Sequence, residues 1–270
     1  MFGRRKVAAL VAEFLAGGVL TLVVLSVQRS TIGVPYFVAL AAGLAAAMLV
    51  FVFGSISGGH GNPAITLALW TARKVGTLTA VLYIVLQCLG AWAAYALYTY
   101  FVNSSLQPIG GEYNGRVLVA EAVGTLILAL GWAAVAFRGS FTLGTRAAVV
   151  GVSYALAVVI AAAAGVGLVN PAVALGTNAW AGLTGTMGLY TYVLGPVLGA
   201  VIGINLYGLL FAPAAVEDDA VVVEEVVVAA AAPAAAVVAA KKPARKAAST
   251  GSKSATSRAK KPAAKRSTRR

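Results

Sequence analysis

The sequence predicts an all-α membrane protein with six transmembrane helices plus two re-entrant half-helices in an inverted repeat, followed by a disordered basic C-terminal tail. Three observations predict this fold class. Hydrophobic residues make up 60% of the 270 positions and charged residues 11%, and the mean hydropathy is +0.88. The tripeptide Asn-Pro-Ala occurs twice, and the composition changes sharply after position 214. A chain with so little polar surface cannot cover a water-soluble globule, so it belongs in a bilayer.

Six apolar runs are long enough to cross a membrane, since a spanning helix needs roughly 20 mostly apolar residues. They cover residues 7–27, 34–53, 75–102, 117–137, 147–164 and 184–211. Shorter apolar pieces, 63–70 and 171–180, follow the two Asn-Pro-Ala motifs. Each short piece would extend roughly 12–15 Å as a helix, near half the hydrocarbon thickness. Two of them end to end would therefore amount to a seventh span.

A constant offset indicates that one unit is present twice. Asn62 and Asn170 are 108 positions apart (170 minus 62), and so are Glu13 and Glu121 (121 minus 13), the only acidic residues inside the apolar runs. The two copies cover about 7–102 and 117–211. Because each copy has three spans, an odd number, the second copy crosses the membrane with opposite polarity. The two motifs then meet near the midplane, where inverted repeats place their working site.

Each Asn-Pro-Ala motif predicts the start of a helix, because asparagine is a good N-cap and proline suits the first helical position. The stretches just before the motifs are rich in glycine. Irregular backbone at membrane depth is tolerated where it lines a water-filled path, so we expect that role here. The alternative is a pair of tight glycine turns with no part in transport. The backbone carbonyls expected along the path are those of Gly58, Gly59, His60, Val166, Gly167 and Leu168.

These motifs carry a family resemblance. Residues 57–67, Ser-Gly-Gly-His-Gly-Asn-Pro-Ala-Ile-Thr-Leu, resemble the first pore loop of the aquaporin and aquaglyceroporin (major intrinsic protein) family. Segments 12–15 and 120–125 resemble its first and fourth helices, and segments 87–91 and 195–200 its third and sixth. The resemblance covers residues 7–211 in order. It implies a homotetrameric channel in a lipid bilayer, whose pore motifs are Asn62, Pro63, Ala64, Asn170, Pro171 and Ala172. The chain shows no nucleophile–base pairing, metal-ligand cluster or phosphate loop, so we expect no enzymatic activity and no cofactor.

The resemblance also implies how such a pore would work. Asn62 and Asn170 would each offer an amide N–H to the oxygen of a passing water molecule, while two positive helix ends repel cations and protons. Glu13 and Glu121 would accept hydrogen bonds from the pore-loop backbone. The alternative role for these carboxylates is proton relay, since ionisable residues inside a membrane are often functional.

His60 is the only histidine in the chain. A pH switch and a metal ligand are both possible roles for a histidine. No second metal ligand lies near it in the sequence, so we expect no metal site. The favoured interpretation is a side chain held by hydrogen bonds within the loop.

The predicted selectivity filter departs from the family pattern. The family usually carries arginine directly after the second Asn-Pro-Ala, where this chain has Val173. Spacing from the motifs places the other three filter positions at Ala42, Val158 and Gly167. All four residues are small or aliphatic, which predicts a wider and less polar opening.

We therefore expect a channel for water and small uncharged solutes. A channel mainly for glycerol, urea or ammonia is the alternative. A secondary transporter is a further alternative, but it would need charged groups at the midplane, and only the two glutamates are present there. A membrane anchor for the basic tail is a third possibility.

Basic residues in the connections predict the orientation. With six crossings, Arg29 and Arg116 fall on one side of the membrane. The tail and all other basic residues of the connections fall on the opposite side, and the positive-inside rule makes that side the cytoplasm. We therefore expect a multi-pass protein of the cell (plasma) membrane with both termini in the cytoplasm.

The chain divides into a channel domain, residues 1–214, and a tail, residues 215–270. The tail is acidic at 217–225 and rich in Lys, Ala, Pro and Ser at 241–270. Such a composition cannot build a core, so we expect disorder. We expect the basic end to lie on anionic lipid. Because its repeats resemble linker-histone tails, nucleic-acid binding is the alternative.

Overall fold

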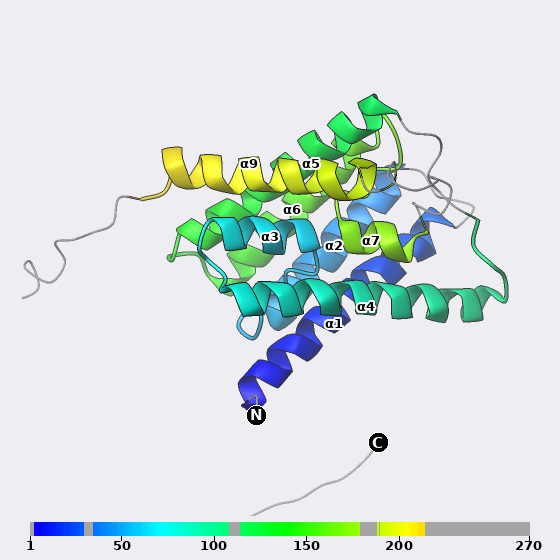
Figure 1. Ribbon diagram of the computed structural model, residues 1–270, viewed down its shortest axis with the longest axis horizontal. Coiled ribbons are helices and arrows are strands. Elements are labelled where there is room, and N and C mark those ends of the chain that lie inside the picture. Colours follow the sequence, from blue (N-terminus) through cyan, green and yellow to red (C-terminus); the bar gives the residue numbers. More distant parts are fainter. Residues whose placement is uncertain (1–2, 30–34, 108–113, 179–187, 189, 214–270) are drawn as a thin grey trace, which may run out of the picture. The chain divides into compact units, whose positions relative to one another are not determined.

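The structure is a computed structural model that describes residues 3–29, 35–107, 114–178, 188 and 190–213. By its contacts the chain divides into two units, Met1–Ala214 and Ala215–Arg270. All of the described residues lie in the first unit. They form helices joined by short connections, with no strand in the described ranges (Figure 1).

Six helical segments are long and apolar enough to cross a membrane, which confirms the predicted fold class. The last of them, Tyr190–Leu210, joins a π-helical turn to a regular helix. The part of this predicted span at 184–187 and 189 lies outside the described residues. The segments are α1 (Arg4–Gln28), α2 (Pro35–Phe53), α4 (Thr77–Val102), α5 (Gly115–Phe137), α6 (Leu143–Ala161), η1 (Tyr190–Leu194) and α9 (Gly195–Leu210).

The bounds of α6 differ from the predicted run 147–164 at both ends. The helix begins earlier, at Leu143, because the Thr142 hydroxyl accepts a hydrogen bond from the Thr145 N–H at 3.1 Å and caps the first turn. It also ends earlier, at Ala161, where the Ala163 N–H donates to a carbonyl only three residues back, that of Ile160. Such tightening is common at helix ends.

Two short helices, α3 (Pro63–Thr71) and α7 (Pro171–Gly176), begin at the prolines of the Asn-Pro-Ala motifs. The predicted second piece, 171–180, was too long at its C-terminal end. The backbone turns at Asn178, which has a left-handed φ of 60°, and residues 179–180 lie outside the described part of the chain. An apolar composition alone does not reveal such a turn.

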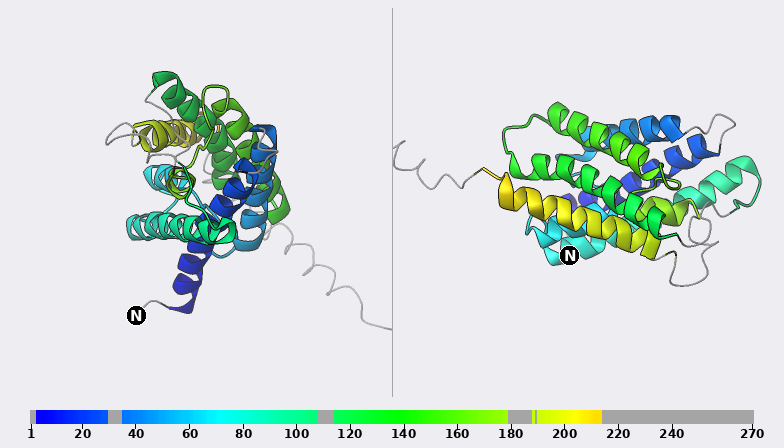
Figure 2. Two further views of the ribbon diagram at one scale, coloured as in Figure 1. Left: turned by 90° about the vertical axis from the view of Figure 1, so that its right-hand side faces the viewer. Right: turned by 90° about the horizontal axis from the view of Figure 1, so that it is seen from above.

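The contacts repeat with the duplication. The offset relates α1 to α5, α2 to α6, α3 to α7 and α4 to α9. Correspondingly, α1 packs on α4 as α5 packs on α9, while α3 packs on α9 as α7 packs on α4. The related helices α2 and α6 pack on each other. Figure 1 and Figure 2 show α5 lying beside α9.

Glycines bring paired helices into close contact. Gly195, Gly199 and Gly203 occur at four-residue spacing, which predicts one close-packed helix face. The structure confirms this for α9 and α5, because a Cβ atom on Gly199 would collide with the backbone carbonyl of Ala122. The glycine face of α9 therefore allows α5 and α9 to pack closely.

Candidate functional site

The two half-helices meet at their N-terminal ends (Figure 1). Asn62 Nδ2 donates a hydrogen bond to the Val169 carbonyl at 3.0 Å, and Asn170 Nδ2 donates to the Gly61 carbonyl at 2.9 Å. Each bond therefore ends on the residue just before the other asparagine. All four residues are buried.

Each asparagine also caps its own helix. The Asn62 side-chain oxygen accepts a hydrogen bond from the Ala64 N–H at 2.9 Å, and the Asn170 oxygen accepts from the Ala172 N–H at 2.9 Å. The prolines occupy the first helical positions, where a missing N–H costs nothing. One amide side chain thus both starts a half-helix and holds the opposite loop.

The residues before the two asparagines share an unusual backbone conformation. Gly61 has a φ of 53° and Val169 a φ of 47°, both in the left-handed region. For a β-branched residue this conformation costs on the order of 1–2 kcal/mol. The Val169 carbonyl is held by Asn62, and its N–H donates to Glu121. These contacts keep a strained residue in place at the centre of the site.

Glu13 holds the first loop. Its Oε1 accepts hydrogen bonds from the Ser57 hydroxyl at 2.6 Å and the His60 N–H at 3.0 Å. Its Oε2 accepts from the Gly61 N–H at 2.9 Å and from Gln87 Nε2 at 2.6 Å. The carboxylate is fully buried, and these four donors compensate for the lost water.

Glu121 holds the second loop in the related way. Its Oε1 accepts from the Leu168 N–H at 2.8 Å and its Oε2 from the Val169 N–H at 2.6 Å. The duplication places Gly195 where the first copy has Gln87, and glycine has no side chain that could donate to the second carboxylate. Both glutamates thus hold the two backbone N–H groups that precede their Asn-Pro-Ala motif.

His60 is packed in place from several sides. Its Nδ1 lies 3.2 Å from the Thr66 hydroxyl, and its ring meets Trp132 and Tyr83 edge-on with centroids 5.2 and 5.7 Å away. Within the described ranges, no three His, Cys, Asp or Glu side chains gather as metal ligands. The histidine therefore stiffens the first loop.

The six loop carbonyls expected along a path have a common property. In the part of the chain that the structure describes, none of them accepts a hydrogen bond. The neighbouring carbonyls of Gly61 and Val169 are, in contrast, taken by the two asparagines. These six unpaired acceptors, which belong to Gly58, Gly59, His60, Val166, Gly167 and Leu168, are available to a polar molecule.

The four filter positions are all buried. Ala42, Val158 and Val173 belong to one buried cluster and are at most 2% exposed. Gly167 has a φ of 70°, and a Cβ atom there would lie 2.6 Å from the Val158 carbonyl oxygen, so only glycine fits. The four filter side chains are thus small or aliphatic and buried, and the wider opening expected from their size stays a prediction.

Tyr154 is a site residue that the sequence patterns did not single out. It lies on α6, and its hydroxyl oxygen is 3.3 Å from Asn170 Nδ2. A tyrosine within an apolar span is easily taken for a packing residue. The sequence does show that the two copies differ here, because the position related to Tyr154 by the duplication holds Ala46.

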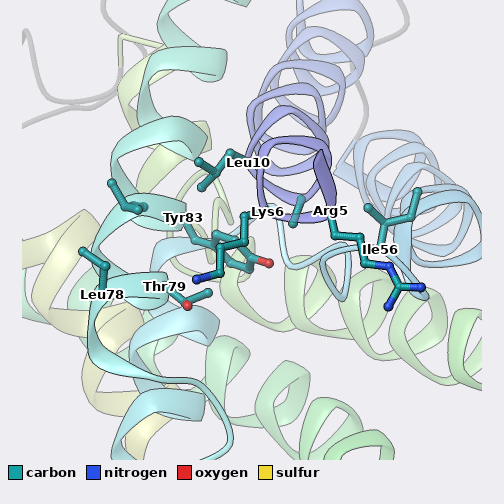
Figure 3. A pocket seen from close by; sticks show the side chains of 9 residues that line it. Arg5, Lys6, Leu10, Ile56, Leu78, Thr79 and Tyr83 are labelled. Carbon is teal, nitrogen blue, oxygen red and sulfur yellow. The ribbon is translucent and has the colours of Figure 1, made fainter. Parts of the chain in front are cut away.

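A separate cavity of about 280 Å³ lies between the beginnings of α1 and α4 (Figure 3). It combines basic side chains, a hydroxyl and apolar walls, and none of the predicted pore residues lines it. Such a mixture is typical of the membrane–water boundary. Its lining includes Arg5, Lys6, Leu10, Ile56, Thr79 and Tyr83.

The fold and the meeting half-helices define a multi-pass membrane protein built from two related halves. The family model described as "Major intrinsic protein" matches residues 4–207. The chain belongs to this family, whose members are membrane channels for water and small solutes rather than enzymes and are typically tetrameric.

Individual relatives agree with this assignment. The chain is 35% identical over 232 residues to Aquaporin-1 of Rattus norvegicus, covering 77% of this chain and 84% of the relative. It is 45% identical over 89 residues to Aquaporin PIP2-5 of Oryza sativa subsp. japonica, covering 30% and 31%. The structure resembles that of the aquaglyceroporin from Plasmodium falciparum, with a TM-score of 0.63, 24% identity, and coverage of 77% and 98%. This last similarity shows a shared fold.

Proposed function

We propose that this protein is a passive channel that conducts water and small uncharged solutes down their gradients and excludes ions and protons. The observation that carries this proposal is the pair of reciprocal hydrogen bonds between Asn62 and Val169 and between Asn170 and Gly61. These bonds bring two helix N-termini together in the middle of a membrane-spanning fold. A solute that passes there meets two helix starts and two amide groups.

Electrostatics support the exclusion of ions. A helix N-terminus carries roughly half a positive charge, and the N-termini of α3 and α7 meet at one point. Pores of the aquaporin type are a recognised example of half-helix dipoles that exclude protons and cations. An amide that donates to the oxygen of a central water would also turn that water's hydrogens away from its neighbours.

The unpaired loop carbonyls support a path on both sides of the centre. Gly58, Gly59 and His60 precede the first motif, and Val166, Gly167 and Leu168 precede the second. Water needs acceptors as well as donors when it leaves bulk solvent, because an unmade hydrogen bond is costly in an apolar surrounding. In this proposal the carbonyls supply the acceptors, while Ala42, Val158, Gly167 and Val173 form the filter.

The lack of a filter arginine favours a second candidate, a channel mainly for glycerol, urea or ammonia. An arginine at Val173 would add a fixed charge and several donors to the filter. Without it, discrimination by the filter rests on shape and apolar contact. The two candidates differ in solute and share the same path.

A transporter mechanism finds less support. A coupled transporter needs an ion or substrate site near the midplane. In the described ranges, the fully buried carboxylates are Glu13 and Glu121, and each already accepts hydrogen bonds through both of its oxygens. Glu13 and Glu121 therefore hold the two loops in place.

The basic residues of the connections favour a cell (plasma) membrane protein with both termini in the cytoplasm. A homotetramer with one pore per subunit follows from the family. We further propose that residues 1–214 form the channel domain and that the basic tail, residues 215–270, lies on anionic lipid, with nucleic acid as the alternative partner.

The test is stopped-flow light scattering on liposomes that contain the full-length chain. A channel speeds osmotic shrinkage without any coupling ion, and an imposed proton gradient stays intact. A transporter would give saturable, ion-dependent uptake. A membrane anchor would give neither response. Shrinkage at the rate of protein-free liposomes would contradict the proposed function.

A further inference from the structure

Tyr154 reaches the centre of the site from α6. An amide NH₂ group carries two hydrogens. On Asn170 one hydrogen is directed to the Gly61 carbonyl at 2.9 Å, and the Tyr154 hydroxyl lies 3.3 Å from the same nitrogen. The phenol therefore stands where a permeating molecule would meet the second amide hydrogen of Asn170.

The other asparagine is not covered in this way. In the described part of the chain, Asn62 Nδ2 has one acceptor, the Val169 carbonyl, so its second hydrogen is free. The position related to Tyr154 by the duplication is Ala46 (154 minus 108), and its methyl group cannot reach the amide. The two halves of the site thus differ by one phenol ring.

Tyr154 also lies close to the predicted filter along α6. Tyr154 precedes the filter position Val158 by four residues, so both lie on one helix face about 6 Å apart along the axis. No filter side chain is larger than valine, whereas a tyrosine stands one turn deeper, beside Asn170. The Tyr154 side chain is only 2% exposed, which leaves little space around it. Tyr154, which lies at the level of the asparagines, is therefore bulkier than the filter residue Val158 on the same face of α6.

We propose that Tyr154 sets the size limit of the pore and selects water over glycerol and urea. Its ring takes up volume that a three-carbon polyol would need. Its hydroxyl accepts from Asn170, and no described group accepts the hydroxyl hydrogen, so this hydrogen can bond the oxygen of a water molecule. Together with the free hydrogen of Asn62, it gives that water two donors. This inference rests on the proposed function and chooses among its solutes.

The experiment measures the ratio of glycerol to water permeability in liposomes that contain the full-length chain. The wild type gives a low ratio. Tyr154→Ala removes the ring and raises the ratio about tenfold or more, the range in which pocket size discriminates between solutes. Tyr154→Phe keeps the ring and therefore the low ratio. It removes the hydroxyl donor but frees the second amide hydrogen of Asn170 for the permeating water, so water permeability stays close to that of the wild type.

A matched control removes another buried tyrosine. Tyr98 lies on α4 and packs with Leu25 and Leu106. Tyr98→Ala leaves the permeability ratio at the wild-type value. Gel filtration in detergent checks folding, and Tyr154→Val serves as a second, less drastic truncation if Tyr154→Ala does not fold.

Two results would overturn the inference. One is an unchanged ratio in folded Tyr154→Ala or Tyr154→Val. The other is a wild-type chain that passes glycerol as readily as its truncated variants. A wild type that passes neither water nor glycerol would contradict the proposed function itself, whereas an unchanged ratio in a conducting Tyr154 variant contradicts only the role of Tyr154.

Discussion

Asn62 and Asn170 each hold the loop that positions the other, with side-chain amides that donate to the Val169 and Gly61 carbonyls at 3.0 and 2.9 Å. Because each asparagine also caps its own half-helix, a shift of one half-helix would break contacts on both sides. The centre of the protein therefore behaves as one structural unit, although its two parts come from distant segments of the chain.

Asn62→Ala removes a helix cap and a buried hydrogen bond at once. We expect the free energy of unfolding to fall by about 2 kcal/mol, the sum of typical values for the two interactions. Titration of the purified protein with a denaturing detergent measures this change. An alanine variant as stable as the wild type would show that the reciprocal bonds contribute little.

Glu121→Gln tests the role of the buried carboxylates. Glu121 accepts two N–H groups through two oxygens, whereas glutamine has one oxygen and must point its NH₂ group at one of these donors. We expect a loss of about 1–3 kcal/mol in the free energy of unfolding. The alternative role, proton relay, predicts instead normal stability with altered proton movement across liposomes.

Gly199→Ala tests the close packing of α9 on α5. The added methyl group would collide with the Ala122 carbonyl, and the overpacking should cost about 1–3 kcal/mol. Gly139→Ala is the matched control, because a Cβ atom there has no neighbour within 4 Å. Thermal denaturation in detergent compares the two variants, and equal melting temperatures would argue against a tight α5–α9 contact.

Much of the fold could be predicted from the sequence, because a bilayer forces apolar runs of spanning length and the duplication is unusually regular. The helix ends were less predictable. Thr142 extends α6 by capping it, and the turn at Asn178 follows an α7 shorter than its apolar run. Such local hydrogen bonds and backbone angles cannot be read from the amino-acid composition of a segment.

The site was predictable where residues repeat and unpredictable where they do not. The offset of 108 pointed to Asn62, Asn170 and the two glutamates together. Tyr154 has no repeat partner of its own kind, since Ala46 occupies the related position.

Val173→Arg tests the filter assignment. In the Tyr154→Ala background, where glycerol should pass, the arginine would narrow the opening and add a fixed charge to the filter. We expect glycerol permeability to fall about tenfold relative to Tyr154→Ala alone. Glycerol-driven swelling of liposomes measures it. Equal permeability of the single and double variants would place Val173 outside the path.

The most direct test of the central claim asks whether water passes beside Asn170. Val173→Cys, in a chain whose only native cysteine is removed by Cys88→Ser, places a single thiol directly after the second motif. Mercuric ion should bind this thiol and reduce osmotic water permeability to that of protein-free liposomes, while Cys88→Ser alone is unaffected. Undiminished water permeability after complete modification of the thiol would contradict a path through the meeting half-helices.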